Sequence, residues 1–198
     1  DSENGSHNAA ADEEITLIDT VRYNGLEVGR KYSVTGTLVD KETGKALLDD
    51  AGKEITASNE FTAEKPNGTI EITFKFSGVS LAGKTTVAFE HMYTDGKEVA
   101  VHADLKDEKQ TEYFPSVHTT ATSNDTEDHV VGANEKVTIT DNVALKALKL
   151  GTEYTLSGIL MDATTGKPIV IDGNTIIARR TFTADAHEMI VPLTYELN

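Results

Sequence analysis

The chain has 198 residues, no cysteine, 6% aromatic residues and a formal net charge of −15. Because this charge repels phosphates and anionic lipid headgroups, binding to nucleic acid or to a membrane surface is excluded. No apolar run approaches the ~20 residues of a membrane-spanning helix, and the length fits one large or two small domains.

Alternating apolar and polar residues predict a series of β-strands in the first part of the chain. Residues 1–14 are polar and without periodicity, and we expect them to form a loop. The predicted strands cover residues 15–23, 31–39, 53–61 and 69–76. Turn sequences separate them, at Asn24-Gly25, at residues 40–45 (DKETGK) and at Pro66-Asn67-Gly68. No helical periodicity is present, and short strands at this spacing are typical of a β-sandwich.

Residues 86–115 (TVAFEHMYTDGKEVAVHADLKDEKQTEYFP) hold most of the candidate chemistry. Their pattern predicts a strand, a turn, a second strand, a short polar loop and a third strand. Glu90, His102 and Gln110 are predicted to lie at the ends of these neighbouring strands, where their side chains can meet.

The pattern begins again after Pro115. The segment that starts at Leu17 (LIDTVRYNGLEVGRKYSVTGTLVDKETGK) matches the one that starts at Ile139 (ITDNVALKALKLGTEYTLSGILMDATTGK), which is an offset of 122 residues. Under this offset Asp19 corresponds to Asp141. A repeat of this length is a domain and not a short solenoid unit. We therefore predict two tandem β-sandwich domains, residues 1–114 and 115–198.

The two copies cover different parts of the repeat. The second stops where the first has Lys75-Phe76, so it has no counterpart of residues 86–115. The first starts at the position of Ser123, so it has no counterpart of residues 117–122 (VHTTAT), which we predict to be the first strand of the second domain. We expect the chain to be a fragment whose second domain is truncated.

Five segments together resemble the VaFE repeat, also called the T-Q ester-bond domain, of Gram-positive surface adhesins. They are VAFE at 87–90, IDTVRYNGL at 18–26, the spacing GxxYxxxGxLxDxxTG at 29–44, HxDxxDxxQT at 102–111 and FPxxxTTAT at 114–122. The resemblance covers essentially the whole chain. It implies an all-β fold of tandem Ig-like β-sandwich domains that cross-link themselves.

The resemblance also implies roles for individual residues. In the family, a threonine of the first strand attacks the carboxamide of a glutamine in the last strand, ammonia leaves and an ester remains. By position, Gln110 is similar to the acyl donor, His102 to the acid/base and Glu90 to the buried acid that hydrogen-bonds the reacting carbonyl. Asp19 is similar to the supporting acid near the threonine, and Asp107 to a second acid beside the glutamine.

In the second domain, the resemblance makes Thr119 the nucleophile and Asp141 its supporting acid. Thr120 is the weaker candidate, because adjacent residues of a strand face opposite ways.

The residue types suit this chemistry without the family. A threonine hydroxyl needs a base to take its proton, and a histidine can pass that proton to the departing nitrogen. A carboxylic acid kept neutral by burial can donate a hydrogen bond to the developing oxyanion. The Asp-x-Asp spacing of a calcium loop is absent around Asp104 and Asp107, so neither a metal nor a cofactor is predicted.

The candidate threonine and glutamine belong to different domains. Thr119 follows Gln110 by nine residues across the domain junction, and we do not expect it to fold back beside Gln110. The missing first strand of domain 1 then comes from outside these residues, or another copy of the chain supplies it.

The predicted function is a structural stalk module of a Gram-positive surface adhesin, extracellular and cell-wall-anchored, with the anchor outside this chain. Its expected partners are neighbouring repeat domains; the host receptor is not predicted. The alternative is a ligand-binding adhesin head that uses loops such as residues 40–45 or 94–97. An enzyme acting on an external substrate is the weakest option, because no pocket-forming insertion or metal motif appears.

Overall fold

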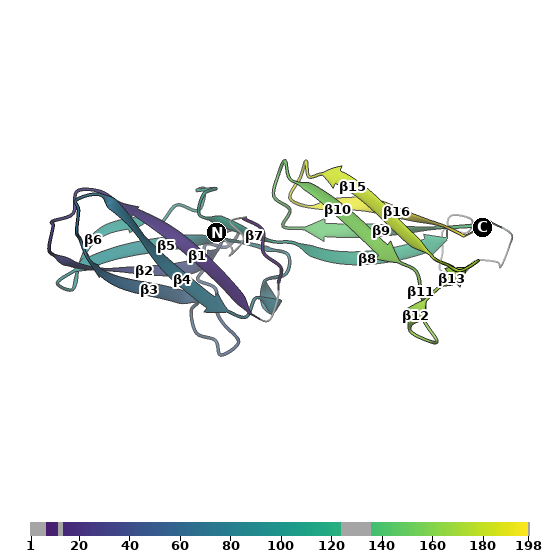
Figure 1. Cartoon of the computed structure of the whole chain (residues 1–198), viewed down its shortest axis with the longest axis horizontal. Coiled ribbons are helices and arrows are strands. Elements are labelled where there is room, and N and C mark those ends of the chain that lie inside the picture. Colours follow the sequence, from purple (N-terminus) through teal and green to yellow (C-terminus); the bar gives the residue numbers. More distant parts are fainter. Residues whose placement is uncertain (1–6, 12–13, 124–135, 198) are drawn as a thin grey trace. The chain divides into compact units, whose positions relative to one another are not determined.

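The computed structural model describes residues 7–11, 14–123 and 136–197. They divide into two compact units, Asp1–Pro115 (unit 1) and Ser116–Asn198 (unit 2). Within the described residues, every regular element is a strand except one 3₁₀ helix, η1 (Val79–Leu81) (Figure 1). The all-β fold class is confirmed.

The described residues form seven strands in unit 1 and nine in unit 2. Those of unit 1 are β1 (Ile15–Tyr23), β2 (Lys31–Asp40), β3 (Thr56–Thr62), β4 (Gly68–Phe76), β5 (Lys84–Thr94), β6 (Lys97–His102) and β7 (Thr111–Phe114). Those of unit 2 are β8 (Ser116–Ser123), β9 (Val137–Lys146), β10 (Glu153–Ile159), β11 (Met161–Asp162), β12 (Lys167–Pro168), β13 (Val170–Ile171), β14 (Asn174–Thr175), β15 (Ile177–Thr183) and β16 (Met189–Leu197).

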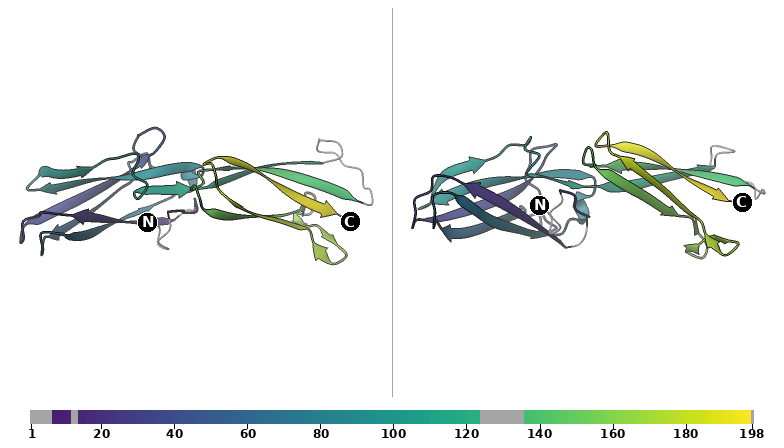
Figure 2. Two further views of the ribbon diagram at one scale, coloured as in Figure 1. Left: turned by 90° about the horizontal axis from the view of Figure 1, so that it is seen from above. Right: turned by 45° about the horizontal axis from the view of Figure 1, so that its top comes forward.

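Unit 1 has two layers of strands. β1 pairs with β4, and the second sheet has the order β3-β2-β5-β6, with β7 paired to the first part of β5. Figures 1 and 2 show the β1–β4 pair lying against the larger sheet. The core between them joins Leu17 and Phe74 of the first layer to Leu38 and Ala88 of the second.

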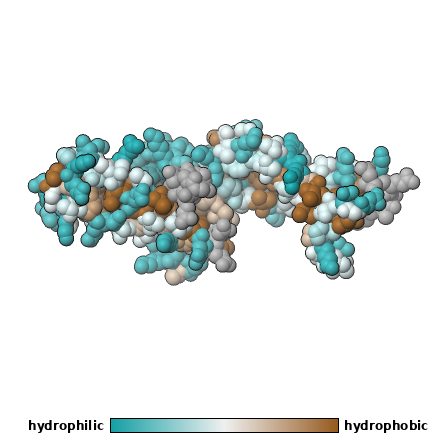
Figure 3. Space-filling view, in the orientation of Figure 1, coloured by the Kyte–Doolittle hydropathy of each residue, from teal (hydrophilic) through white to brown (hydrophobic). Residues whose placement is uncertain are grey.

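The alternation in β1 sets which side chains enter this core. Ile15, Leu17 and Asp19 are buried, whereas Thr20 and Arg22 are exposed. Because side chains alternate between the two faces of a strand, Asp19 enters the core in phase with the apolar residues. On the face drawn in Figure 3, hydrophilic residues predominate and apolar residues form smaller groups between them.

The prediction that Glu90 ends a strand is wrong. β5 continues to Thr94, and Met92 is buried in the core of unit 1. Polar His91 and Tyr93 lie on the other face of the same strand, so the alternation simply continues past Glu90. Glu90 is therefore held in a strand interior, directly opposite His102 of β6.

Unit 2 repeats the β1–β4 pair and adds a strand to it. β9 and β16 are the counterparts of β1 and β4, and β8 pairs with the other edge of β9. In unit 1, β4 is the only described strand that pairs with β1. The edge of β1 that corresponds to the β8 position is thus unpaired within the described part of the chain.

The structure contains no helix of the length and apolarity that a membrane span requires, among the residues it describes.

One close approach recurs in both units. A Cβ built on Gly36 of β2 would lie 2.7 Å from Cζ of Phe74, and one built on Gly158 of β10 would lie 2.8 Å from Cδ2 of Leu193. Both glycines therefore allow a large side chain of the facing sheet to rest on the backbone of the opposite strand.

We predict that Gly36→Ala and Gly158→Ala each lower the free energy of unfolding by about 1–3 kcal/mol, because the added methyl overpacks the core. Thr35→Ala, which changes the opposite face of β2, is the matched control. Urea unfolding of the variants measures the effect, and a Gly36→Ala chain as stable as the control would contradict it.

Candidate functional site

A cleft of about 420 Å³ lies beside β1, at the edge for which the structure describes no partner strand. Its lining is Asp19, Thr20, Val21, Arg22, Glu90, His102, Asp107, Lys109 and Gln110. The structure thus brings together all five residues singled out by sequence in the first domain, from β1, β5, β6 and the loop before β7. Their chemical roles stay predictions.

The imidazole of His102 lies between two carboxyl groups. Its Nδ1 is 3.3 Å from Oε2 of Glu90, and its Nε2 is 3.3 Å from Oδ2 of Asp107. Glu90 is buried, whereas about half of the His102 side chain is exposed. The ring is therefore held at the mouth of the cleft, where it can exchange protons with a group that enters.

Glu90 is a carboxylic acid at neutral pH. Burial is the main cause that raises its pKa to about 9, and the nearby charges of Asp19 and Asp107 raise it further. Two acids from opposite layers lie close together in an apolar core, and a proton kept by Glu90 relieves their repulsion. The neutral Glu90 keeps a hydrogen to donate.

Asp19 completes this pair from β1. It is only 5% exposed, and its Oδ2 has no hydrogen-bond partner among the described residues. Burying a carboxyl oxygen without a hydrogen-bond partner destabilises the folded state. Asp19 is therefore a candidate functional residue and not only a packing residue.

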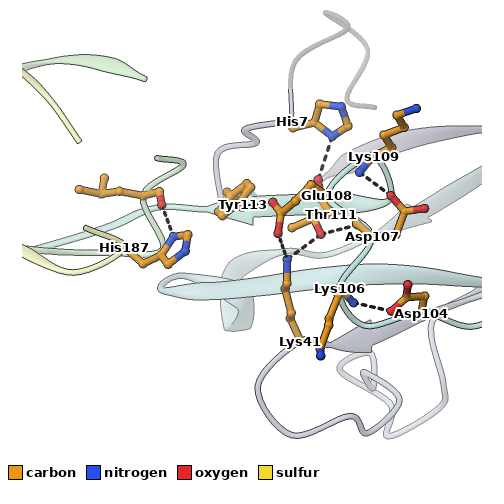
Figure 4. A network of polar contacts seen from close by, with 11 residues as sticks. His7, Lys41, Asp104, Lys106, Asp107, Glu108, Lys109, Thr111, Tyr113 and His187 are labelled. Atoms are coloured by element: carbon orange, nitrogen blue, oxygen red, sulfur yellow. Dashed lines mark hydrogen bonds and ion pairs between the residues drawn. The ribbon is translucent and has the colours of Figure 1, made fainter. Parts of the chain in front are cut away.

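Two consecutive turns bring Gln110 to the cleft. Asp107 N–H donates to Asp104 O (3.1 Å), and Gln110 N–H donates to Asp107 O (3.2 Å). The side chain of Asp107 also accepts a hydrogen bond from the backbone N–H of Lys109 (2.8 Å; Figure 4). The carbonyl of Gln110 accepts from Ala88 N–H of β5 (3.1 Å), so its backbone is fixed two residues from Glu90.

Asp104 has a structural role. Its Oδ1 accepts a hydrogen bond from Lys106 N–H (2.9 Å) and closes the first turn. In residues 7–11, 14–123 and 136–197, no group of three or more His, Cys, Asp and Glu side chains is arranged to hold a metal ion.

Sequence reasoning missed His7. Residues 7–9 run parallel to β7, with Tyr113 N–H donating to His7 O and Ala9 N–H donating to Tyr113 O (both 2.9 Å). His7 Nδ1 lies 2.8 Å from the carbonyl oxygen of Thr111, next to Gln110 (Figure 4). The available signal was the repeat, because His7 corresponds to His129, which lies outside the described residues.

In unit 2, β8 carries the threonine that the sequence singles out. Thr119 lies opposite Val143, a core residue of β9, and Thr120 lies opposite Asn142, which is exposed. Directly opposed residues share a face, so Thr119 is on the core side of β8, where its side chain is exposed in this unit.

Asp141 is buried like its counterpart Asp19. Burial raises its pKa, and a backbone hydrogen bond from Thr120 partly offsets this shift. Unit 2 ends before the repeat reaches counterparts of Glu90, His102 and Gln110. Thr119 and Gln110 therefore lie in different units.

The fold and the site together define tandem β-domains, one of which presents a glutamine beside a buried carboxylic acid and a histidine. The chain belongs to the T-Q ester bond containing domain family, whose model matches residues 1–113 and again residues 115–198. The resemblance inferred from the sequence motifs is confirmed.

Two solved structures are similar to the chain. Both are of a bacterial adhesin from Mobiluncus mulieris, described as containing intramolecular disulfide, isopeptide and ester bond cross-links. Their identities to this chain are 12% and 14%, with TM-scores of 0.48 and 0.47. Each comparison covers 82% of this chain, and 88% and 87% of the respective adhesin chains. A comparison with curated protein sequences found no match.

We predict that stability depends on pH through Glu90. Its folded-state pKa of about 9 lies above the ordinary 4.5, so the folded chain keeps a proton that the unfolded chain releases. The stabilisation is complete below about pH 4.5 and is lost as the pH rises towards 9, with a slope of at most about 1.4 kcal/mol per pH unit.

Glu90→Gln removes this titration, so the variant should be more stable than the parent chain at pH 8 and close to it at pH 4. Glu60→Gln, an exposed change on β3, is the control and should keep the parent slope. Urea unfolding between pH 4 and 9 measures the difference. Parallel curves for Glu90→Gln and the parent chain would show that Glu90 titrates normally.

Proposed function

We propose that the chain is a structural stalk module of a Gram-positive surface adhesin, stabilised by an autocatalytic ester between Gln110 and a threonine. The observation that carries this proposal is the cleft, which gathers Gln110, His102 and Glu90 beside β1, at the edge that has no partner strand among the described residues. The surface-adhesin setting comes from the family resemblance.

Unit 2 indicates where the threonine would enter. β8 places Thr119 opposite Val143, and Val143 corresponds to Val21 in the repeat. Val21 lines the cleft together with Gln110. A strand like β8, docked on β1 in the same register, would bring its threonine hydroxyl to the cleft.

The reaction then follows from the positions of the side chains. His102 takes the hydroxyl proton as the threonine oxygen attacks the carboxamide carbon of Gln110, and neutral Glu90 donates a hydrogen bond to the developing oxyanion. His102 passes the proton to the departing nitrogen, the C–N bond breaks, and ammonia leaves an ester behind. Asp107 holds the ring during both transfers.

Each site reacts only once. The product is the cross-linked module itself, and no substrate is released. An ester between the first and last strands makes a covalent path along which a pulling force travels without loading the hydrogen bonds of the sheets. This property suits a stalk that is fixed to the cell wall and under tension.

Two sources of the strand are compatible with the proposal. It comes from a neighbouring repeat domain of the same protein, or from β8 of another copy, with Thr119 joined to Gln110 of its neighbour. Both sources supply the same chemistry on the same edge of β1.

The alternative function, a ligand-binding head, has one observation in its favour. The turn at residues 94–96 borders a cavity of about 590 Å³ that Tyr93, Phe61 and Tyr32 also line. Tyr32 is buried in the core, however, which limits the aromatic surface open to a ligand. Repetition of the domain favours the stalk.

We predict that the denatured chain alone has its full sequence mass. Adding a synthetic peptide with the sequence of β8 (SVHTTATS) should yield an adduct lighter by one ammonia than the sum of its parts, because the peptide completes the site. Intact-mass spectrometry measures the product, and cleavage by mild base identifies an ester.

Gln110→Ala should give no adduct. A peptide with Thr119→Val should be inert, whereas one with Thr120→Val should react. Base-labile multimers without any peptide would show that copies complete one another. Failure of every peptide, with no multimers, would exclude the proposed cross-link.

A further inference from the structure

Unit 1 encloses a second, much smaller cavity on the inner side of the cleft. It has a volume of about 10 Å³, which is about the space that one water-sized molecule requires. Asp19 and Gln110 line both this cavity and the cleft. Gln110 therefore lies at the boundary between them.

Buried polar groups surround this small cavity, which we call the Thr86 pocket after its most buried polar residue. Thr86 of β5 is 0% exposed, and its Oγ1 has no hydrogen-bond partner among the described residues. Oδ2 of Asp19 likewise has no hydrogen-bond partner among the described residues. The buried carboxyl group of Glu112 also lines the pocket. Orphaned polar atoms of this kind are rare in folded proteins and call for a partner.

The remaining walls favour a small guest. Leu17, Leu38 and Ala88 are all core residues and give the pocket apolar sides. The carboxyl groups of Asp19 and Glu112 accept hydrogen bonds, and the Thr86 hydroxyl can donate one. A fitting guest is of water size, donates two or more hydrogens and accepts one, which describes both water and ammonia.

The segment missed by sequence reasoning contributes His7 to the wall of the pocket. His7 is among the lining residues, lies 3.8 Å from Oε2 of Glu112 and contacts the carbonyl of Thr111 (Figure 4). The backbone bonds between residues 7–9 and Tyr113 hold this segment against β7. His7 thus forms part of the wall of the Thr86 pocket beside Glu112.

We propose that the Thr86 pocket binds one small hydrogen-bond donor: water in the unreacted chain, and the ammonia that leaves Gln110 during ester formation. The second half rests on the proposed function. When the C–N bond of Gln110 breaks, the nitrogen takes the proton that His102 received from the threonine hydroxyl. The resulting ammonia moves into the pocket and displaces the water.

This arrangement separates the leaving group from the new ester. Ammonia held on the inner side of Gln110 is bonded to Asp19, Thr86 and Glu112, so its lone pair is kept from the ester carbonyl. The reverse reaction, aminolysis of the ester, is thereby slowed while the docked strand settles.

The water half is tested by a high-resolution crystal structure of the chain and of two valine variants. We expect one ordered water within hydrogen-bond distance of Thr86 Oγ1 and Asp19 Oδ2, absent in Thr86→Val and retained in Thr85→Val. Thr85 is the matched control, because it is the preceding residue of β5 and faces the other way. An empty pocket in the parent chain would overturn this half.

The ammonia half is tested with the β8 peptide and a chain labelled with ¹⁵N in its glutamine side chains. Thr86→Val should slow ester formation about tenfold through loss of one hydrogen bond, and Thr86→Ser should restore the rate. In the parent chain, a ¹⁵N ammonium signal should remain with the protein longer than in Thr86→Val. Equal rates and equal release would overturn this half.

The outcome for the proposed function is separate. If no variant forms an ester but the ordered water is present, the proposed function and the ammonia half fail together, and the water site stands. If esters form equally fast in all variants and the pocket is dry, the cross-link stands and this inference is wrong.

Discussion

The contact on which the site depends is the pair of carboxyl groups that Glu90 and Asp19 contribute from opposite layers of unit 1. Two ionised acids cannot remain close together in an apolar core, so one of them must keep its proton. The raised pKa of Glu90 shows which acid keeps it. The proposed role of Glu90 depends on that proton. A neutral carboxyl group can donate a hydrogen bond to developing negative charge, whereas a carboxylate repels it. His102 and Gln110 derive their proposed roles from their places around this pair.

Much of the fold could be predicted because the alternation of apolar and polar residues shows where a β-strand lies and which of its faces is buried. The alternation of Ile15, Leu17 and Asp19 with exposed residues gives both the strand and its buried face. The end of β5 was mispredicted because Glu90 interrupts an apolar run, and a buried acid looks locally like the start of a turn. The two cases differ in the facing layer, where Asp19 lies close to Glu90, and Asp19 is 71 positions away along the chain.

The candidate site divides in the same way. The strand pattern predicted that Glu90, His102 and Gln110 meet, and the family resemblance added Asp19 and Asp107. The structure gathers all five in one cleft. The contact of His7 with Thr111 was not predicted, because the two residues are 104 positions apart. His7 also lies in a polar segment that has no periodic pattern. The pocket at Thr86 could not be predicted from the sequence. Whether a buried hydroxyl has a hydrogen-bond partner depends on residues that are distant in the chain, and no local sequence pattern indicates them.

The unpaired edge of β1 has a consequence for how such a module is made and stored. An exposed strand edge accepts any extended chain of suitable pattern, which makes it a nucleation point for aggregation. The outward side chains of Thr20 and Arg22 add polarity and one charge to this strand. Such a module is least prone to aggregate when a partner strand pairs with β1 during synthesis. It is most prone to misassembly when the protein is synthesised faster than that strand pairs. Yield at high expression level therefore depends on how this edge is covered.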